Sequence, residues 1–454
     1  MPAAQEEIAV RYRLLERVFD ARRHSDALFS LVRADSMYER PIPERHRIIF
    51  YLGHLEAFDW NLLHESVLGL GSFHSEFDQL FAFGIDPVGG GLPSDRPADW
   101  PSLKTVHDYV ARIRANLDER LAEGVLEPHA HTRDGFSLDI LLNVAIEHRL
   151  MHVETLAYML HPLPLDRKIH QVRPPKMNLP KMDAPSPIVP PPNHRMVEIP
   201  PGTATLGLAR RGDSFGWDNE YDAHTLQMPA FEIDQYMVTN GQYLDFMAAG
   251  GYETRDFWSD DDWNWKTAHD VSYPVFWENA SGGWLYRTMF DEIPLPLDWP
   301  VYVSHAEAAA YARWAGKSLP TETEWHRAAY GTMDGSERPY PWGSEQPNSN
   351  FGNFDFDRWD PAPVNAFPRG RSAFGVDGML GNGWEWTSTV FAPFPGFEPF
   401  PFYRGYSADF FDGKHFVMKG ASARTAACML RSTFRNWFQA HYQHVYAGFR
   451  CVRR

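Results

Sequence analysis

The sequence predicts a protein of two dissimilar parts, an N-terminal bundle of α-helices and a C-terminal irregular α+β domain. Apolar residues recur at the i, i+3, i+4, i+7 spacing of a helix in several segments between residues 4 and 160. Prolines crowd the stretch from residue 162 to residue 195, and beyond it Trp, Gly, Asp, Asn and Pro are dense. We therefore expect a bundle over residues 1–161, a proline-rich strap or linker over 162–195, and the α+β domain over 196–454.

The helical pattern of the N-terminal part comes from five segments, which span residues 8–19, 27–32, 48–58, 106–117 and 138–152. Between the third and the fourth lies a Gly/Pro/Asp-rich stretch over 83–101, FGIDPVGGGLPSDRPADWP. A loop of more than about 15 residues in a compact domain is usually functional. The pattern favours an up-and-down helical bundle with one long connection.

The strap and the C-terminal part have different local signals. A segment as rich in proline as 162–195 cannot be helical and favours extended, polyproline-like chain. In the C-terminal part, only 241–248, 304–315 and 325–330 read as helices. Ser304 is expected to cap the second of them, because Glu307 three residues later completes a capping box.

Composition excludes several classes of protein. Among 454 residues, Lys and Arg number 43 and Asp and Glu 59, so the formal net charge is −16, which disfavours nucleic acid and anionic membranes as partners. Only Cys428 and Cys451 occur, so a Cys-rich zinc or iron–sulfur site is excluded, and buried structural thiols are expected. Neither a signal peptide nor an apolar run of about 18 residues is visible, so we expect a cytoplasmic protein. No obligate protein partner is evident.

Two histidines four residues apart, His148 and His152, are the sharpest chemical feature of the sequence. At this spacing both imidazoles lie on one helix face and can share a metal ion. The apolar residues of the same helix place that face in the bundle interior, where buried imidazoles need partners. Glu154 lies about 200° round the helix from His152, so we expect it to support the site from outside the ligand set.

A third histidine, His54, lies among apolar residues of another predicted helix. Three inward imidazoles from two helices would leave coordination positions open for other ligands. All-imidazole ligation fits Zn, Fe(II), Ni or Cu, and the spacing does not choose among them. The HExxH pattern of zinc proteases is absent.

With these histidines, the chain resembles the EgtB-like family of nonheme-iron sulfoxide synthases. That family joins a DinB-like four-helix bundle to a C-terminal domain of the formylglycine-generating-enzyme and C-type-lectin-like type. The matching histidines are His54, His148 and His152, and Glu154 completes an HxxxHxE motif. Matching C-terminal blocks are Met237–Tyr243, Leu319–Trp325, Pro341–Gly343, Leu380–Thr387 and Tyr446–Arg450.

The resemblance implies a cofactor, a co-substrate and an acceptor. It implies that the three histidines bind Fe(II), and that the enzyme uses O2 to join a chalcogen atom to C2 of an imidazole, usually that of hercynine. It also implies that Asn436 and Trp437 hold hercynine, since an aromatic face suits a quaternary ammonium group and an amide can bind a carboxylate. Core packing is the other interpretation of Trp437, one of 16 tryptophans.

The chain departs from the family in the loop that binds the chalcogen donor. Family members that use γ-glutamylcysteine carry an arginine-rich loop there, whose guanidinium groups bind the donor carboxylates. Here the stretch 86–94 reads DPVGGGLPS, with only Arg96 nearby. Such a loop is expected to favour a neutral or hydroxylated donor such as a sugar, contacted by Ser94, Arg96 and the backbone of 89–91.

Two further departures concern single positions. Phe391 occupies the position of the family's proton-donating tyrosine, and phenylalanine has no proton to donate. Met151 replaces the polar residue that usually precedes the second helix histidine, which is expected to change the acceptor pocket. This set of changes is most similar to the selenoneine synthases (SenA), which use a selenosugar donor.

We therefore expect a selenoneine-type synthase that forms a C–Se bond on hercynine. One alternative is an ergothioneine-type hercynine sulfoxide synthase whose donor is cysteine, γ-glutamylcysteine or a thiosugar. Another is a non-catalytic ligand-binding module built from the same two domains. Acidic runs at 260–262 and 354–357 could hold a structural Ca²⁺, although a solvated acidic loop is the simpler interpretation.

Overall fold

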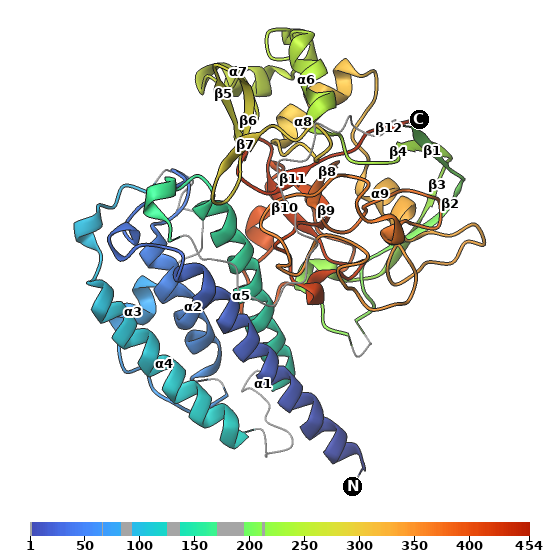
Figure 1. Cartoon of the computed structure of the whole chain (residues 1–454). Helices are drawn as coiled ribbons and strands as arrows, with labels where there is room; N and C mark the ends of the chain where they lie inside the picture. Colours follow the sequence, from blue (N-terminus) through green and yellow to red (C-terminus); the bar gives the residue numbers. More distant parts are fainter. Residues whose placement is uncertain (1, 66, 83–92, 125–136, 170–194, 211–213) are drawn as a thin grey trace. The chain divides into compact units, whose positions relative to one another are not determined.

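The computed structural model describes residues 2–65, 67–82, 93–124, 137–169, 195–210 and 214–454 (Figure 1). The chain divides into two compact units, residues 1–177 and 178–454. The first is built from α-helices, whereas the second combines short strands with short helices, which confirms the predicted fold class.

The N-terminal unit is a helical bundle. Its long helices are α1 (Pro2–Phe29), α2 (Ile48–Leu63), α4 (Leu103–Gly124) and α5 (Leu138–Leu160). The short helix α3 (Ser75–Leu80) lies between α2 and α4 in the sequence. Helix α5 packs against α1 and α2, and α2 also packs against α4. Every residue of α2 except Phe58 and Asn61 is buried, and α5 is buried almost all round. A helix that is buried on nearly every side lies inside a bundle, so α2 and α5 form its core.

The sequence pattern did not predict helix α3. With six residues, it is too short to show a helical period. It is held by aromatic packing, since Phe77 and Phe81 contact the ring of Tyr109 on α4 at centroid distances of 5.3 and 5.9 Å. The loop predicted over 83–101 follows this helix, and residues 83–92 of that loop lie outside the described residues.

The described residues of the C-terminal unit form four small sheets. The largest has the strand order β10 (Asn436–Gln439), β9 (His415–Ala421), β8 (Gly383–Val390) and β11 (Ala447–Gly448). A second sheet joins β1 (Met196–Ile199), β4 (Phe231–Asp234) and β12 (Val452–Arg453). The others pair β2 (Gly202–Leu206) with β3 (His224–Met228), and β5 (Trp277–Ala280), β6 (Gly283–Arg287) and β7 (Glu292–Pro294) in order.

A buried ion pair fixes the centre of this unit. Glu385 on β8 accepts two hydrogen bonds from Arg450, at 2.6 and 2.7 Å, and one from the indole N–H of Trp325 at 2.9 Å. All three side chains are fully buried. The WEW block and the C-terminal GFR block, far apart in sequence, therefore meet in one hydrogen-bonded cluster.

The predicted helices of the C-terminal unit are confirmed, and each begins at a capping box. They are α6 (Asn240–Ala248), α8 (His305–Trp314) and α9 (Glu322–Tyr330). Ser304 caps α8, and Glu307 accepts from the Ser304 backbone N–H at 2.8 Å, as the spacing predicts. A further helix, α7 (Asp260–Ala268), was not predicted.

The acidic run 260–262 forms the first turn of α7, where the positive end of the helix dipole stabilises negatively charged carboxylates. Asp262 accepts hydrogen bonds from Ser259 and His441. In the other run, Asp355 accepts from the backbone of Ala427. The expectation of Ca²⁺ at these runs stays a prediction.

Cys451 is buried, as predicted, whereas Cys428 is only half-buried, and the two do not form a disulfide. Within the described part of the chain, no helix is both long enough and apolar enough to cross a membrane.

Candidate metal centre

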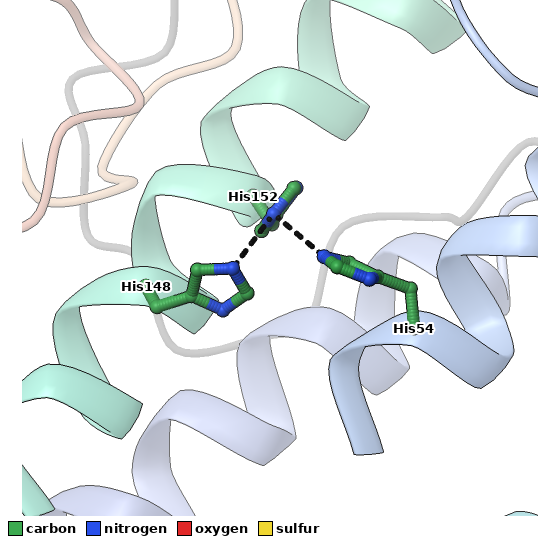
Figure 2. Close-up of side chains that lie close together, drawn as sticks. All are labelled: His54, His148 and His152. Carbon is green, nitrogen blue, oxygen red and sulfur yellow. Dashed lines mark hydrogen bonds between the residues drawn. The ribbon is translucent and has the colours of Figure 1, made fainter. Parts of the chain in front are cut away.

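The three predicted histidines come together inside the N-terminal unit (Figure 2). His54 extends from α2, and His148 and His152 extend from successive turns of α5. The Nε2 atom of His152 lies 3.2 Å from Nε2 of His54 and 3.2 Å from Nε2 of His148. The candidate ligand atoms all lie within 4.8 Å of one another, and the side chains are only 3–6% exposed. Among the described residues, no other group of histidine, cysteine or carboxylate side chains is gathered in this way.

A backbone carbonyl orients His54. Its Nδ1–H donates to the carbonyl oxygen of Phe81 at 2.7 Å. Because a carbonyl oxygen can only accept, the ring proton lies on Nδ1, and Nε2 presents a lone pair to the other histidines. The contact depends on Gly53, since a Cβ at this position would lie 2.5 Å from the Phe81 ring.

Aromatic rings pack on the imidazoles from outside. Phe58 stacks on His148 at a centroid distance of 3.4 Å, and Phe50 stacks on His54 at 4.9 Å. Tyr51 contacts the ring of His152 at 5.9 Å. These contacts restrict the rotation of the imidazoles and keep water from the site.

Burial keeps the three imidazoles neutral. It lowers the pKa of His54 to about 4, although the hydrogen bond to Phe81 opposes this shift. It also lowers the pKa of His148 and of His152 well below 6.5, and the neighbouring histidines act in the same direction. Neutral imidazole is the form that binds a metal ion.

The arrangement of nitrogen atoms fits a cation. A proton on Nε2 of His152 can form a linear hydrogen bond to His54 or to His148, but not to both. One of the two 3.2 Å contacts between nitrogen atoms is therefore left without a linear hydrogen bond. No described group near Nδ1 of His152 accepts or donates a hydrogen bond. A divalent metal ion bound by three lone pairs removes this conflict, and three imidazoles suit zinc, iron, nickel or copper.

The other predicted residues of α5 lie close to the histidines in sequence. Glu154 is buried, and Met151 is half-buried. The role of Glu154 outside the ligand set and that of Met151 in an acceptor pocket stay predictions. Sequence reasoning missed the Phe81 carbonyl, for which the only available signal was the glycine before His54.

The predicted donor contacts lie on an exposed segment. Ser94 is exposed, and Arg96, with an 81% exposed side chain, donates to Asp99 in its own turn. The backbone of 89–91 lies outside the described residues. The predicted contacts of these residues with a donor stay predictions.

Two arginines outside the predicted set bind a carboxylate of this segment. Arg40 and Arg47 both bind Asp95, the latter at 2.8 Å, and the indole of Trp100 donates to it at 2.7 Å. Burial would raise the pKa of Asp95, but the hydrogen bonds of Trp100 and Arg47 hold it below its usual range. Asp95 therefore remains ionised and neutralises part of the charge of both arginines.

The predicted acceptor residues come together in the C-terminal unit. Trp437 on β10 stacks on Phe391 at a centroid distance of 4.2 Å and an interplanar angle of 6°. Tyr406 meets the same indole edge-on at 5.4 Å, and Phe410 lies 5.7 Å away. Asn436 accepts from the Trp437 backbone N–H at 2.9 Å. Phe391 is buried, whereas Asn436 and Trp437 are half-buried.

Both units match known protein families. Residues 184–454 match the sulfatase-modifying factor enzyme 1-like domain, and residues 20–156 match the DinB superfamily. The chain is 34% identical to a formylglycine-generating enzyme of Thermomonospora curvata, over 42% of this chain and 70% of that protein.

Two further relatives have names that refer to hercynine or ergothioneine. Identity is 42% with a hercynine oxygenase of Mycobacterium tuberculosis, over 54% of this chain and 57% of that protein. It is 28% with ergothioneine biosynthesis protein 1 of Neurospora crassa, over 92% of this chain and 55% of that protein. The chain thus spans little more than half the length of these two relatives. It belongs to the family of proteins with a sulfatase-modifying factor enzyme 1-like domain, carries a DinB domain before it, and is homologous to the hercynine oxygenases.

Proposed function

We propose that this chain is an Fe(II)- and O2-dependent enzyme that forms a carbon–chalcogen bond at C2 of the imidazole of hercynine. The observation that carries the proposal is the convergence of three neutral, buried imidazoles at 3.2 Å contacts. Its occurrence in a DinB domain followed by a sulfatase-modifying factor enzyme 1-like domain, in a homologue of hercynine oxygenases, supports iron as the metal.

The bundle residues would hold and shield the metal. Iron(II) bound by His54, His148 and His152 would supply the O2-dependent oxidation and leave positions open for reactants. The Phe81 carbonyl fixes the tautomer of His54. The rings of Phe50 and Phe58 limit the access of water.

The acceptor would be held by the aromatic cluster around Trp437. Hercynine carries a quaternary ammonium group, which the electron-rich face of Trp437 can attract. The side-chain amide of Asn436 can donate to a carboxylate. Phe391 packs flat on Trp437 and so supports this cluster, but it offers no hydroxyl for proton transfer.

Two classes of donor remain as candidates. The names of the relatives refer to hercynine and ergothioneine, so they favour a sulfur donor over the selenosugar expected from the sequence. The second candidate, a selenosugar or another uncharged donor, is favoured by the glycine-rich stretch 86–94 and by the pairing of Arg40 and Arg47 with Asp95. These arginines already bind a carboxylate and so are poorly available to an anionic donor.

The test is reconstitution with Fe(II) without oxygen, followed by O2, hercynine and one donor at a time. The donors are cysteine, γ-glutamylcysteine, a thiosugar and a selenosugar, and products are read by mass spectrometry. We expect a hercynine adduct in the wild-type chain and none in His148→Ala. An adduct with only one class of donor identifies the function, whereas binding of hercynine without an adduct from any donor would favour a ligand-binding module.

A further inference from the structure

A fully buried guanidinium group lies beside the three-histidine centre. Arg149 follows His148 on α5 and is 1% exposed. It donates to Glu56 at 2.9 Å, to Asp59 at 2.6 Å and to the carbonyl oxygen of Leu55 at 3.0 Å, all on α2. It also contacts Ser25 of α1 at 3.3 Å. A buried arginine requires such partners, since an unpaired buried charge is very costly.

These contacts connect the backbone next to one histidine with the backbone next to another. Arg149 is the residue after His148, and Leu55 is the residue after His54. Glu56 is about 200° round α2 from His54. Arg149 and the histidine cluster therefore contact different faces of α2. Contacts at two such points fix the rotation of α2 as well as its distance from α5.

The other long helices of the bundle also contact this ion cluster. Arg114 of α4 donates to Glu56 at 2.9 and 2.7 Å and pairs with Asp26 of α1. Arg22 of α1 lies 3.9 Å from the second oxygen of Glu56. The carboxylate of Glu56 thus faces guanidinium groups from three helices.

A buried ion cluster is a poor source of stability. Removing charges from water costs several kcal/mol per ion, and apolar side chains of the same volume often replace such clusters without loss of stability. A cluster of this kind can instead define one relative position of the helices, because its bonds are directional and short. The position it defines here is that of α2 against α5.

We propose that Arg149 is a positioning residue for the histidine centre, which sets α2 against α5 so that His54 meets His148 and His152. This rests on the proposal that the histidines bind a metal. Ligand distances tolerate errors of only about 0.2 Å. A shift of α2 by one residue moves His54 by about 1.5 Å along the helix axis, which is enough to lose one of the three ligands.

The test measures Co(II) binding without reference to catalysis. Variants are Arg149→Met, Arg149→Lys, and the double variant Arg149→Met/Asp59→Asn, which also neutralises Asp59, the carboxylate whose hydrogen-bonded counter-charge is Arg149. Arg17→Met is the matched control, because Arg17 bonds Asn143 at 3.0 Å and so links α1 to α5 without involving α2. Folding is verified by circular dichroism and thermal unfolding, and titrations are done well below the unfolding temperature.

We expect Co(II) to bind the folded Arg149 variants at least 10-fold more weakly than the wild type, which is the loss typical of residues that orient ligands. The visible Co(II) absorption, which reports the ligand geometry, should change with it. Arg17→Met should keep both the affinity and the spectrum. The double variant should regain stability without regaining affinity, and it keeps the test decisive if Arg149→Met does not fold.

Wild-type affinity and an unchanged spectrum in the folded Arg149 variants would show that Arg149 has a structural role only. Equal losses in Arg17→Met would show that general loosening of the bundle is responsible. Failure of the metal proposal looks different, because the wild-type chain itself would then bind no Co(II), which would overturn the positioning role as well.

Discussion

Replacing His148 by alanine should abolish the stabilisation of the N-terminal unit by metal, while changing His64 should not. A ligand that binds only the folded state stabilises it by RT ln(1 + [L]/Kd), which is about 2.7 kcal/mol at 100 times the dissociation constant. For a unit of this size, 1 kcal/mol corresponds to roughly 2–4 °C. Saturating Fe(II) should therefore raise the unfolding temperature of the wild type by about 5–10 °C.

Loss of one imidazole should remove nearly all of this shift. If the affinity falls 100-fold, the same Fe(II) concentration contributes about 0.4 kcal/mol, or about 1 °C. His148→Ala also leaves a cavity beside Phe58, which stacks on the imidazole at 3.4 Å, so the metal-free variant should unfold earlier than the wild type. The informative quantity is therefore the difference between the unfolding temperatures with and without metal.

The assay is thermal unfolding without oxygen, followed by circular dichroism at a helix wavelength. His64 is a suitable control because it is a half-buried histidine at the end of the same α2 and lies outside the triad. A full metal shift in His148→Ala would refute our interpretation of the centre. The loss of the shift in His64→Ala as well would show that the metal acts elsewhere or that binding is nonspecific.

Four further predictions concern the C-terminal unit and the donor loop. Glu385→Gln should destabilise the C-terminal unit by about 3–5 kcal/mol, because Arg450 is left without its buried counter-charge; tryptophan fluorescence during urea unfolding measures this, and a loss below about 1 kcal/mol would contradict it. Burial lowers the pKa of His305 to about 4 from its usual 6.5. The unfolded chain therefore takes up a proton at this residue at a higher pH than the folded chain does, and the free energy of unfolding falls as pH drops from 6.5 toward 4. Between pH 7 and 4.5 this loss of stability is about 2–3 kcal/mol, and the free energy of unfolding of His305→Gln should fall by that much less over the same range. An equal pH dependence in the wild type and in His305→Gln would argue against this role of His305. Trp437→Ala should raise KM for hercynine about 5–30-fold, the equivalent of about 1–2 kcal/mol, and Trp437→Phe should raise KM by less. An unchanged KM in Trp437→Ala would assign Trp437 to core packing. An arginine-rich sequence in place of 86–94 should increase turnover with γ-glutamylcysteine, and no increase would count against the loop as the determinant of donor choice.

Much of the histidine centre could be predicted because its strongest signal is local. His148 and His152 are four residues apart on one helix, so helical geometry alone places them together. His54 joins them only through the packing of α2 on α5, which the apolar pattern indicates but does not fix in register. His54 donates a hydrogen bond to the backbone carbonyl of Phe81, 27 residues away, and no pattern of side chains in the sequence predicts this bond.

Charged residues inside apolar helices are a further signal of contact between α2 and α5. Glu56 and Asp59 lie in α2, which is otherwise mostly apolar, and Arg149 lies in the buried part of α5. Charges at such positions must be paired when the helices are buried. This reasoning predicts contact between α2 and α5 near the histidines, although it cannot decide which carboxylate receives which N–H group.

In the C-terminal unit, the helix starts could be predicted from the sequence, but the sheets could not. Capping boxes are local, so the start of α8 could be placed to the residue. The sheets could not be predicted, because their strands are short and their partners distant. The backbone N–H of Cys451, the residue before β12, binds Asp234 of β4, 217 residues earlier in the chain. A periodic pattern within a short window of the sequence cannot predict a contact between residues so far apart in the chain.

Several residues of α2 and α5 are poorly explained by the stability of the bundle alone. The imidazoles of His54, His148 and His152 face one another across contacts that cannot all be linear hydrogen bonds, and leucines of similar volume would pack there without that conflict. The ions around Arg149, one residue from His148, likewise cost free energy of desolvation. Both groups lie in the same two helices within a few residues of each other. A bundle needs neither of them to fold, whereas a metal centre needs the first as ligands and gains a fixed geometry from the second. Their coincidence is therefore best explained by ligand geometry.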